Sequence, residues 1–162
     1  MIRVGVFSDS HGDSNALDEL LEKMGYVDAV CFLGDVARDA EHLEGRLGAM
    51  PNRPPLYAVR GNNDYYNTCP LPWELLIELG GKRIYMTHGH RLVSYMSLVY
   101  KAQEAQADIA LFGHTHQHFC EVYQGVLLLN PGSAGNYCRG GRARASVLEI
   151  RESGCRVTNV AL

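Results

Sequence analysis

The sequence predicts an α/β protein with four layers, α/β/β/α, in which two mixed sheets pack together and helices cover their outer faces. Two observations predict this fold class. In the first half of the chain, short apolar strands alternate with amphipathic helices, which is typical of a parallel sheet. In the second half the strands come in hairpins around one main helix. This mixture indicates a two-layered β core with helices outside it.

The first half contains three predicted strands, at 2–8, 29–33 and 56–59. Each is a short run of apolar or β-branched residues that ends at a turn signal, as buried strands do. Two helices with one apolar face lie between the strands. The first ends at Gly25 and the second at Gly48, because glycine commonly follows the last helical turn.

The second half contains three predicted hairpins, each with a glycine in its turn. Their strand pairs are 75–79 with 83–87, 119–123 with 126–130, and 145–150 with 155–162. Between the first two hairpins, residues Tyr95 to Ala105 have helical spacing and 109–112 form a short apolar strand.

Length and composition predict one globular domain over residues 1–162. The chain is 46% hydrophobic and 20% charged, which excludes a disordered or collagen-like protein. No apolar stretch is long enough to span a membrane, and no signal peptide is recognisable. The net charge of −3 argues against nucleic-acid binding. Five cysteines without a CxxC pair favour a reducing, cytoplasmic setting.

Polar residues follow successive predicted strands at a nearly constant interval. Asp9, Asp35, Asn62, His88 and His114 are separated by 26, 27, 26 and 26 residues. Ligand sites of open α/β sheets form at the carboxyl ends of the strands. We therefore expect these side chains to meet at one rim of the protein.

Two further histidines lie next to this series, in Asp9-Ser10-His11 and His114-Thr115-His116. In an extended segment, residues two apart point the same way, so each pair is expected to reach one ion. Carboxylate, amide and imidazole groups suit divalent transition metals. The candidates are too many for one tetrahedral ion and fit two ions that share a carboxylate: Asp9, His11, Asp35, Asn62, His88, His114 and His116.

In chain order the motifs are D-x-H, G-D, G-N-x-D, H-G-H and G-H-T-H, followed by Asn130-Pro131-Gly132-Ser133. This succession resembles the calcineurin-like metallophosphoesterase superfamily, and the short chain resembles its small prokaryotic phosphodiesterase branch, the YfcE-type proteins. The resemblance runs from Asp9 to Ser133. Each motif alone is weak, but five in the same order are specific.

The resemblance implies a metallophosphoesterase that binds two divalent ions and hydrolyses small phosphodiesters through a metal-bridging hydroxide. One ion would be held by Asp9, His11, Asp35 and His116, and the other by Asp35, Asn62, His88 and His114. Manganese is the expected ion, with iron, cobalt, nickel and zinc as alternatives. Two ions, two carboxylates and a hydroxide would leave one net positive charge for an anionic substrate.

Three further residues are candidates for catalysis beside the metals. Asn63 stands where many larger members of the superfamily have a histidine, and an amide cannot supply a proton to a leaving group. Good turnover is therefore expected only for activated diesters. Asp64 is expected to orient a ligand. His90 either contacts the phosphate or bonds to the rim.

Other polar residues keep simpler interpretations. Asp13 and Asp39 are interpreted as helix-start residues, and His42 and His118 as surface residues. The basic loop with Arg139, Arg142 and Arg144 is either a phosphate contact or a solvated turn. The aromatic residues after Asn62 either line the cleft and stack a base, or pack in the core or at an oligomer contact: Tyr65, Tyr66 and Trp73.

Two other functions remain open at this point. The same residues would serve a phosphomonoesterase or a nucleotide pyrophosphatase. A non-catalytic scaffold is the other alternative, because a retromer subunit resembles this fold and length but has a degraded site. Asn62 and the four ligand histidines favour catalysis. A homodimer or higher homo-oligomer is expected on base rates.

Overall fold

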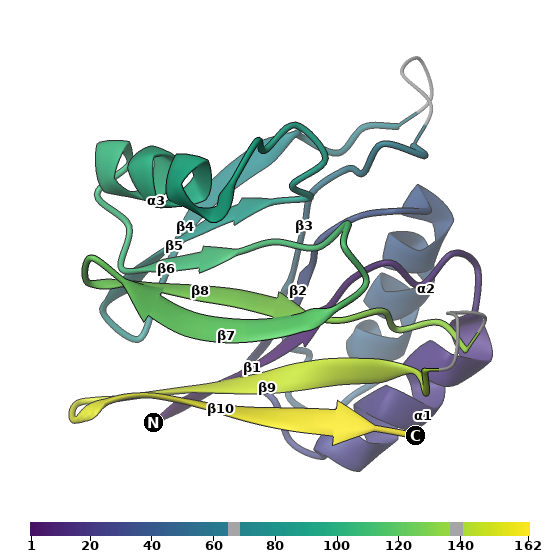
Figure 1. Ribbon diagram of the computed structural model, residues 1–162. Helices are drawn as coiled ribbons and strands as arrows, with labels where there is room; N and C mark the ends of the chain where they lie inside the picture. Colours follow the sequence, from purple (N-terminus) through teal and green to yellow (C-terminus); the bar gives the residue numbers. More distant parts are fainter. Residues whose placement is uncertain (65–68, 137–140) are drawn as a thin grey trace.

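The computed structural model describes residues 1–64, 69–136 and 141–162, and these form two mixed five-stranded sheets packed face to face (Figure 1). The first sheet has the order β10-β9-β1-β2-β3, with β1, β2 and β3 parallel and β9 and β10 antiparallel. Its strands are β1 (Ile2–Phe7), β2 (Ala29–Phe32), β3 (Leu56–Ala58), β9 (Arg144–Arg151) and β10 (Gly154–Ala161).

The second sheet has the order β4-β5-β6-β8-β7, with a parallel centre of β5, β6 and β8 and an antiparallel strand at each edge. Its strands are β4 (Glu74–Leu79), β5 (Lys82–Thr87), β6 (Ile109–Leu111), β7 (His118–Tyr123) and β8 (Val126–Pro131). The three predicted hairpins are β4-β5, β7-β8 and β9-β10, so each is confirmed.

In the described part of the chain, three helices cover the outer faces of the two sheets (Figure 1). The helices α1 (Ser14–Met24) and α2 (Ala37–Gly48) pack on the first sheet, and α3 (Tyr95–Glu104) packs on the second. Asp13 caps α1, as its interpretation as a helix-start residue requires. Within the described residues, no helix is long and apolar enough to cross a membrane.

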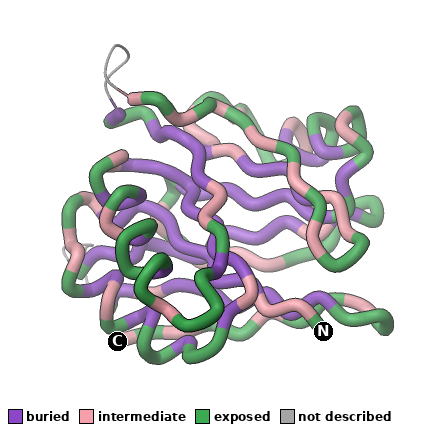
Figure 2. The backbone as a smooth tube through the Cα atoms, turned by 180° about the vertical axis from the view of Figure 1, so that it is seen from behind, coloured by how far each residue is buried: buried purple, intermediate pink, exposed green. Residues whose placement is uncertain are grey.

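The core has three layers because side chains alternate along each central strand. Val4 and Val6 of β1 point to the second sheet, and Phe7 points to α1 and α2. In the second sheet, Ile84 points to the first sheet and Tyr85 to α3. Figure 2 shows buried backbone running through both sheets. The predicted four-layer class is therefore confirmed.

The sequence did not predict which sheet each hairpin joins. The hairpin β9-β10 closes onto β1, with Val4 opposite Leu148, and so extends the sheet of the first half. The other two hairpins flank the parallel centre of the second sheet. The parallel strands of both sheets point to the same end of the molecule, on the right in Figure 1, and this end carries the site.

Candidate metal centre

The structure brings all seven predicted ligands together at one rim. Asp9 and Asp35 follow β1 and β2, and Asn62 follows β3 in the first sheet. His88 follows β5 and His114 follows β6 in the second sheet. The two sheets meet here, because the backbone N–H of His114 donates to Oδ2 of Asp9, at 2.9 Å. The expected convergence of strand ends is thus what the structure contains.

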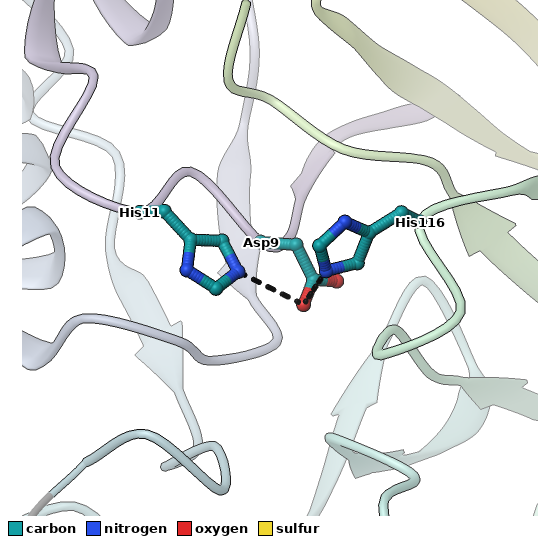
Figure 3. A group of neighbouring side chains, drawn as sticks. All are labelled: Asp9, His11 and His116. Atoms are coloured by element: carbon teal, nitrogen blue, oxygen red, sulfur yellow. Dashed lines mark ion pairs between the residues drawn. The ribbon is translucent and has the colours of Figure 1, made fainter. Parts of the chain in front are cut away.

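One group of ligand atoms surrounds Oδ1 of Asp9, between His11 and His116 (Figure 3). The Nε2 atom of His116 lies 3.3 Å from this oxygen and that of His11 lies 3.9 Å from it. The Nε2 of His11 is also 3.4 Å from Oδ2 of Asp35.

A second group surrounds Nε2 of His88. It lies 3.5 Å from Oδ2 of Asp35 and 3.7 Å from Oδ1 of Asp9. It is also 2.9 Å from Oδ1 of Asn62, which in turn lies 3.1 Å from Nδ1 of His114. Both groups therefore include Asp9 and Asp35, and Asn62 joins two histidines of the second group.

These spacings fit ligands around an ion. Nitrogen and oxygen ligands lie about 2.0–2.2 Å from zinc, so two of them at a tetrahedral angle are about 3.4 Å apart. Most distances in both groups are close to this value. Asp9, Asp35 and His88 are also fully or almost fully buried. Two buried carboxylates with histidine nitrogens close to both of them are a donor set suited to divalent cations.

The backbone reaches this arrangement in a way that the sequence analysis did not foresee. Asp9, His11, His114 and His116 have φ of 52°, 47°, 70° and 61°, and Asp35 has φ of 60°. These are left-handed conformations. The prediction that the pairs Asp9/His11 and His114/His116 lie in extended segments was therefore wrong. Non-glycine residues in this region cost about 1–3 kcal/mol each and cluster at functional sites. The side chains converge because the loops turn sharply.

Asp9 is held by the residue before it and by two other segments of the chain. Its Oδ2 accepts hydrogen bonds from the Ser8 hydroxyl, at 2.6 Å, and from the His114 amide. Its backbone carbonyl accepts from the Ser133 hydroxyl at 2.7 Å. Asn130 donates to the carbonyl of Gly113 at 3.0 Å. The Asn130–Ser133 motif thus ties together the two loops that carry ligands of the first group, and Oδ1 of Asp9 is left facing the histidines.

A positioning residue that the sequence analysis missed lies in α2. Asp39 is buried, and its Oδ2 accepts from the Ser10 hydroxyl and from the backbone N–H of Gly12 at 2.8 Å. It therefore holds the loop between Asp9 and His11, besides lying in the first turn of its helix. The periodic series of strand ends contained no signal for it, because Asp39 belongs to a helix.

Two glycines are required by close approach. A Cβ at Gly113 would overlap the Ser8 hydroxyl and lie 2.7 Å from Oδ2 of Asp9. A Cβ at Gly61 would overlap the Asp35 carboxylate. Only glycine fits at these two positions, because it has no side chain to occupy the space beside the carboxylates.

Comparison with known proteins identifies the family. The model of the calcineurin-like phosphoesterase superfamily domain matches residues 2–153. The chain belongs to this superfamily. It is 32% identical over 136 residues to the probable metallophosphoesterase YsnB of Bacillus subtilis, covering 82% of this chain and 75% of YsnB. It is 24% identical over 158 residues to the phosphodiesterase MJ0936 of Methanocaldococcus jannaschii, covering 86% and 88%.

Solved structures agree with the fold of this phosphoesterase. A predicted phosphoesterase from Streptococcus pneumoniae superposes with a TM-score of 0.80 at 33% identity, over 99% of this chain and 89% of the other. Vps29 from Entamoeba histolytica, solved as a complex with Zn²⁺, superposes with a TM-score of 0.73 at 21% identity, over 99% of both chains. The second likeness concerns the fold alone.

The pKa values of three predicted ligands of the phosphoesterase are shifted by burial and by neighbouring charges. Burial would raise the pKa of Asp35, but hydrogen bonding and charge from His88, with N–H donors from Asn63, bring it below its usual range. Burial lowers the pKa of His88, but Asp35 and Asp9 outweigh this and raise it. Burial and the neighbouring His88 lower the pKa of His114, which favours the neutral imidazole that binds metals.

The tautomer of His88 is set by a contact between the two sheets. Its Nδ1 lies 2.7 Å from the backbone carbonyl of Leu33, to which it donates. The opposite nitrogen, Nε2, is therefore the one that faces Asp35 and Asn62. A ligand histidine that donates its other N–H to a carbonyl is the usual arrangement in metal sites.

Asn63 and Asp64 have different surroundings. Asn63 is exposed, and its side-chain amide donates to Oδ2 of Asp35 at 2.8 Å. Asp64 is buried, and its carboxylate accepts from the backbone N–H of Ala37 at 2.6 Å and of Gly61 at 2.7 Å. Asp64 therefore orients the loops beside Asp35 and Asn62 by backbone contacts, whereas Asn63 faces the rim.

His90 and Trp73 form one wall beside the site. The His90 ring lies 5.6 Å from that of His88 and 5.4 Å from that of Trp73. Trp73 is flanked by the guanidinium groups of Arg60 and Arg91, at 4.3 Å and 4.4 Å from its ring centre. Trp73 thus belongs to the edge of the site, while Tyr65 and Tyr66 lie outside the described residues.

The remaining candidates lie away from the two groups. His42 of α2 is half-exposed and contacts Asp18 of α1, with 2.8 Å between Nε2 and Oδ1. His118 is half-buried at the start of β7, so its interpretation as a surface residue was only partly correct. Arg139 lies outside the described residues, and Arg142 and Arg144 border a pocket beside His116.

Proposed function

We propose that this phosphoesterase hydrolyses phosphodiesters with two divalent metal ions. The observation that carries the proposal is the position of Asp35 Oδ2, which lies 3.4 Å from Nε2 of His11 and 3.5 Å from Nε2 of His88. One carboxylate oxygen between two histidines from separate ligand groups fits a ligand that bridges two ions. Asp9, His11 and His116 complete one group, and Asn62 and His114 complete the other.

Bound divalent ions would lower the pKa of a coordinated water and neutralise phosphoryl charge. We propose manganese as the activating ion from the family resemblance, while mixed oxygen and nitrogen donors also suit iron, cobalt, nickel and zinc. The chain itself supplies orientation. Ser8 and His114 hold Asp9, and Asn63 holds Asp35, so both carboxylates face inward before any ion binds.

Asn63 and His90 are the residues we propose to contact the substrate. The amide of Asn63 has a second N–H beside its bond to Asp35, and this donor is at the exposed rim. Burial and the positive charge of His88 lower the pKa of His90, so its imidazole is neutral near pH 7 and donates one N–H. Neither role requires proton transfer to the leaving group.

The surface on either side of the centre favours a diester over a monoester. A pocket of about 380 Å³ borders His90 and His114, and another of about 370 Å³ borders His116. A phosphodiester carries two substituents, and each would occupy one pocket. The similarity to a protein named as a phosphodiesterase supports the same choice.

The test combines metal content with hydrolysis of matched nitrophenyl substrates. We expect about two metal ions per chain, and faster turnover of bis(p-nitrophenyl) phosphate than of p-nitrophenyl phosphate. Asp35→Ala and His114→Ala should lose activity and metal. His42→Ala is the control, because this histidine contacts Asp18 away from the ligand groups.

Three results would contradict the proposal in different ways. Preference for p-nitrophenyl phosphate would indicate a monoesterase, and preference for nucleoside diphosphate esters a pyrophosphatase. A folded chain without turnover on any substrate or metal would favour a scaffold.

A further inference from the structure

A basic pocket lies beside the proposed metal centre, and the proposed function assigns it one substituent of the diester without using its charge. It has a volume of about 370 Å³ and opens next to His116. Its described lining comes from the residues that lead into β7, from the loop after β8 and from the segment that enters β9: His116, Gln117, His118, Ser133, Gly141, Arg142 and Arg144. His116 faces Asp9 on one side and belongs to this pocket on the other.

Arg144 has a fixed position in the pocket. Its backbone N–H donates to the carbonyl of Ser133 at 2.8 Å, and Ser133 in turn donates to the carbonyl of Asp9. Its aliphatic stem lies against Gly132, where a Cβ would come within 2.9 Å of Cγ and Cδ of the arginine. The aliphatic stem of Arg144 therefore packs on the segment whose Ser133 is hydrogen-bonded to Asp9, a proposed metal ligand.

The described lining of the pocket carries positive charge and contains no carboxylate. The other described arginines include several in ion pairs, such as Arg3 with Glu149 at 2.8 Å and Arg46 with Asp18 at 3.1 Å. Within the described part of the chain, neither Arg142 nor Arg144 has an ion-pair partner, and the lining of the pocket contains no acidic side chain. This is notable in a chain with net charge −3.

The pocket on the other side of the centre has a different character. It is lined by Leu92, Val93, Tyr95 and Phe112 together with His90 and His114, and Tyr95 and Phe112 are in edge contact. A substrate phosphate at the metal centre would thus have an apolar surface on one side and two guanidinium groups on the other. The two substituents of a diester would meet unlike surroundings.

We propose that the pocket of Arg142 and Arg144 binds a second anionic group of the substrate. The preferred substrates are then phosphodiesters in which the substituent that stays bonded to phosphorus carries a further phosphate. This rests on the proposed phosphodiesterase function and specifies its substrate class. A guanidinium group presents paired N–H donors that match phosphate oxygens. The leaving group would occupy the apolar pocket, which suits an aromatic or nucleobase-like substituent.

The test compares two substrates with the same leaving group. Thymidine 5′-(p-nitrophenyl phosphate) lacks a second anion, and its 3′-phosphorylated form carries one. With the manganese-loaded protein, we expect KM to be about tenfold lower for the 3′-phosphorylated form. Arg142→Gln with Arg144→Gln should remove this difference by raising KM for the 3′-phosphorylated substrate.

Arg156→Gln is the matched control, because it removes one positive charge from β10, away from the pocket. Arg142→Gln alone keeps the test valid if the Arg144 variant does not fold, since Arg142 is exposed. Equal KM values for the two substrates, or an undiminished difference in the double variant, would overturn the subsite while leaving the phosphodiesterase intact.

A binding measurement separates the two proposals. If neither ester is hydrolysed with any metal, the phosphodiesterase proposal fails, and calorimetry with thymidine 3′,5′-bisphosphate and thymidine 5′-phosphate then tests the pocket directly. Tighter binding of the bisphosphate, lost in the double variant, supports the anion subsite. Equal binding of both nucleotides overturns it.

Discussion

The carboxylate of Asp39, in the first turn of α2, accepts a hydrogen bond from the hydroxyl of Ser10, between two proposed metal ligands. The same oxygen accepts from the backbone N–H of Gly12 at 2.8 Å. One buried side chain thus holds the sharp turn from Asp9 to His11, where both residues have positive φ. A helix that is otherwise only an outer layer of the fold therefore contributes to the geometry of the site.

Asp39→Ala should weaken metal binding by about 10–100-fold, which is the usual effect of losing a residue that orients ligands. The measurement is metal affinity by competition with a chelator. Asp28→Ala is the matched control, since Asp28 also accepts from a hydroxyl and a backbone N–H, those of Tyr26 and Arg3, far from the site. Equal affinities in the two variants would contradict the role of Asp39.

Gly113→Ala should destabilise the protein and weaken metal binding, because its Cβ would displace Ser8 and Asp9. Urea unfolding and metal titration are the measurements. Gly45→Ala provides the contrast: Gly45 lies within α2 with open space around it, so the change should stabilise the fold by about 0.5–1 kcal/mol. Wild-type affinity in Gly113→Ala would show that the loop tolerates the side chain.

Metal should raise the melting temperature strongly. The left-handed backbone at Asp9, His11 and Asp35 and the two buried carboxylates are costs that an ion offsets only in the folded state. A metal at about 1,000 times its Kd contributes about 4 kcal/mol. Thermal unfolding with manganese and with EDTA measures this effect, and identical curves would refute it.

The stability of the metal-free protein should depend on pH through His88. Its folded pKa is raised, so its stabilising contribution is present below the unfolded pKa of about 6.5 and is lost as pH rises through the folded pKa. The difference in unfolding free energy between wild type and His88→Gln should therefore shrink as pH rises from about 6.5 through the higher folded pKa of His88. Urea unfolding in EDTA across this range is the measurement.

His114→Gln should behave in the opposite way in the same experiment. Burial and His88 lower the pKa of His114, so this residue destabilises the fold once pH falls below its unfolded value. The free energy of unfolding of the variant should therefore increase relative to that of wild type as pH falls. The same sign for both variants would contradict the two shifts.

Asn63→His should raise turnover of alkyl phosphodiesters, which have poor leaving groups. An imidazolium at the exposed rim beside Asp35 can give a proton that the amide cannot, and general acid catalysis typically contributes about 10²–10⁴-fold. The kcat for an alkyl diester relative to a nitrophenyl diester measures this effect. Asn63→Ala is the control for loss of the amide, and an unchanged ratio in Asn63→His would show that proton supply is not limiting.

The regular spacing of the motifs was sufficient to predict that five of the seven side chains meet, because each of the five follows a strand, and His11 and His116 lie two residues from members of this series. The same reasoning failed on their local geometry. Asp9 and His11 were expected in an extended segment, yet both are left-handed. A short sequence such as Asp9-Ser10-His11 is compatible with an extended or a turned backbone. The hydrogen bonds from Ser10 and Gly12 to Asp39 stabilise the turned conformation.

By itself, the sequence determined the kinds and order of the strands and helices, the four-layer class and the family, since these depend on local apolar periodicity and on motifs within a few residues. Only the tertiary structure decided that Ser133 holds Asp9 across 124 residues of chain, and that Arg144 lies in a pocket beside His116. The physical reason is that such contacts join segments through the packing of whole sheets. No pattern of neighbouring residues specifies which side chains that packing brings together.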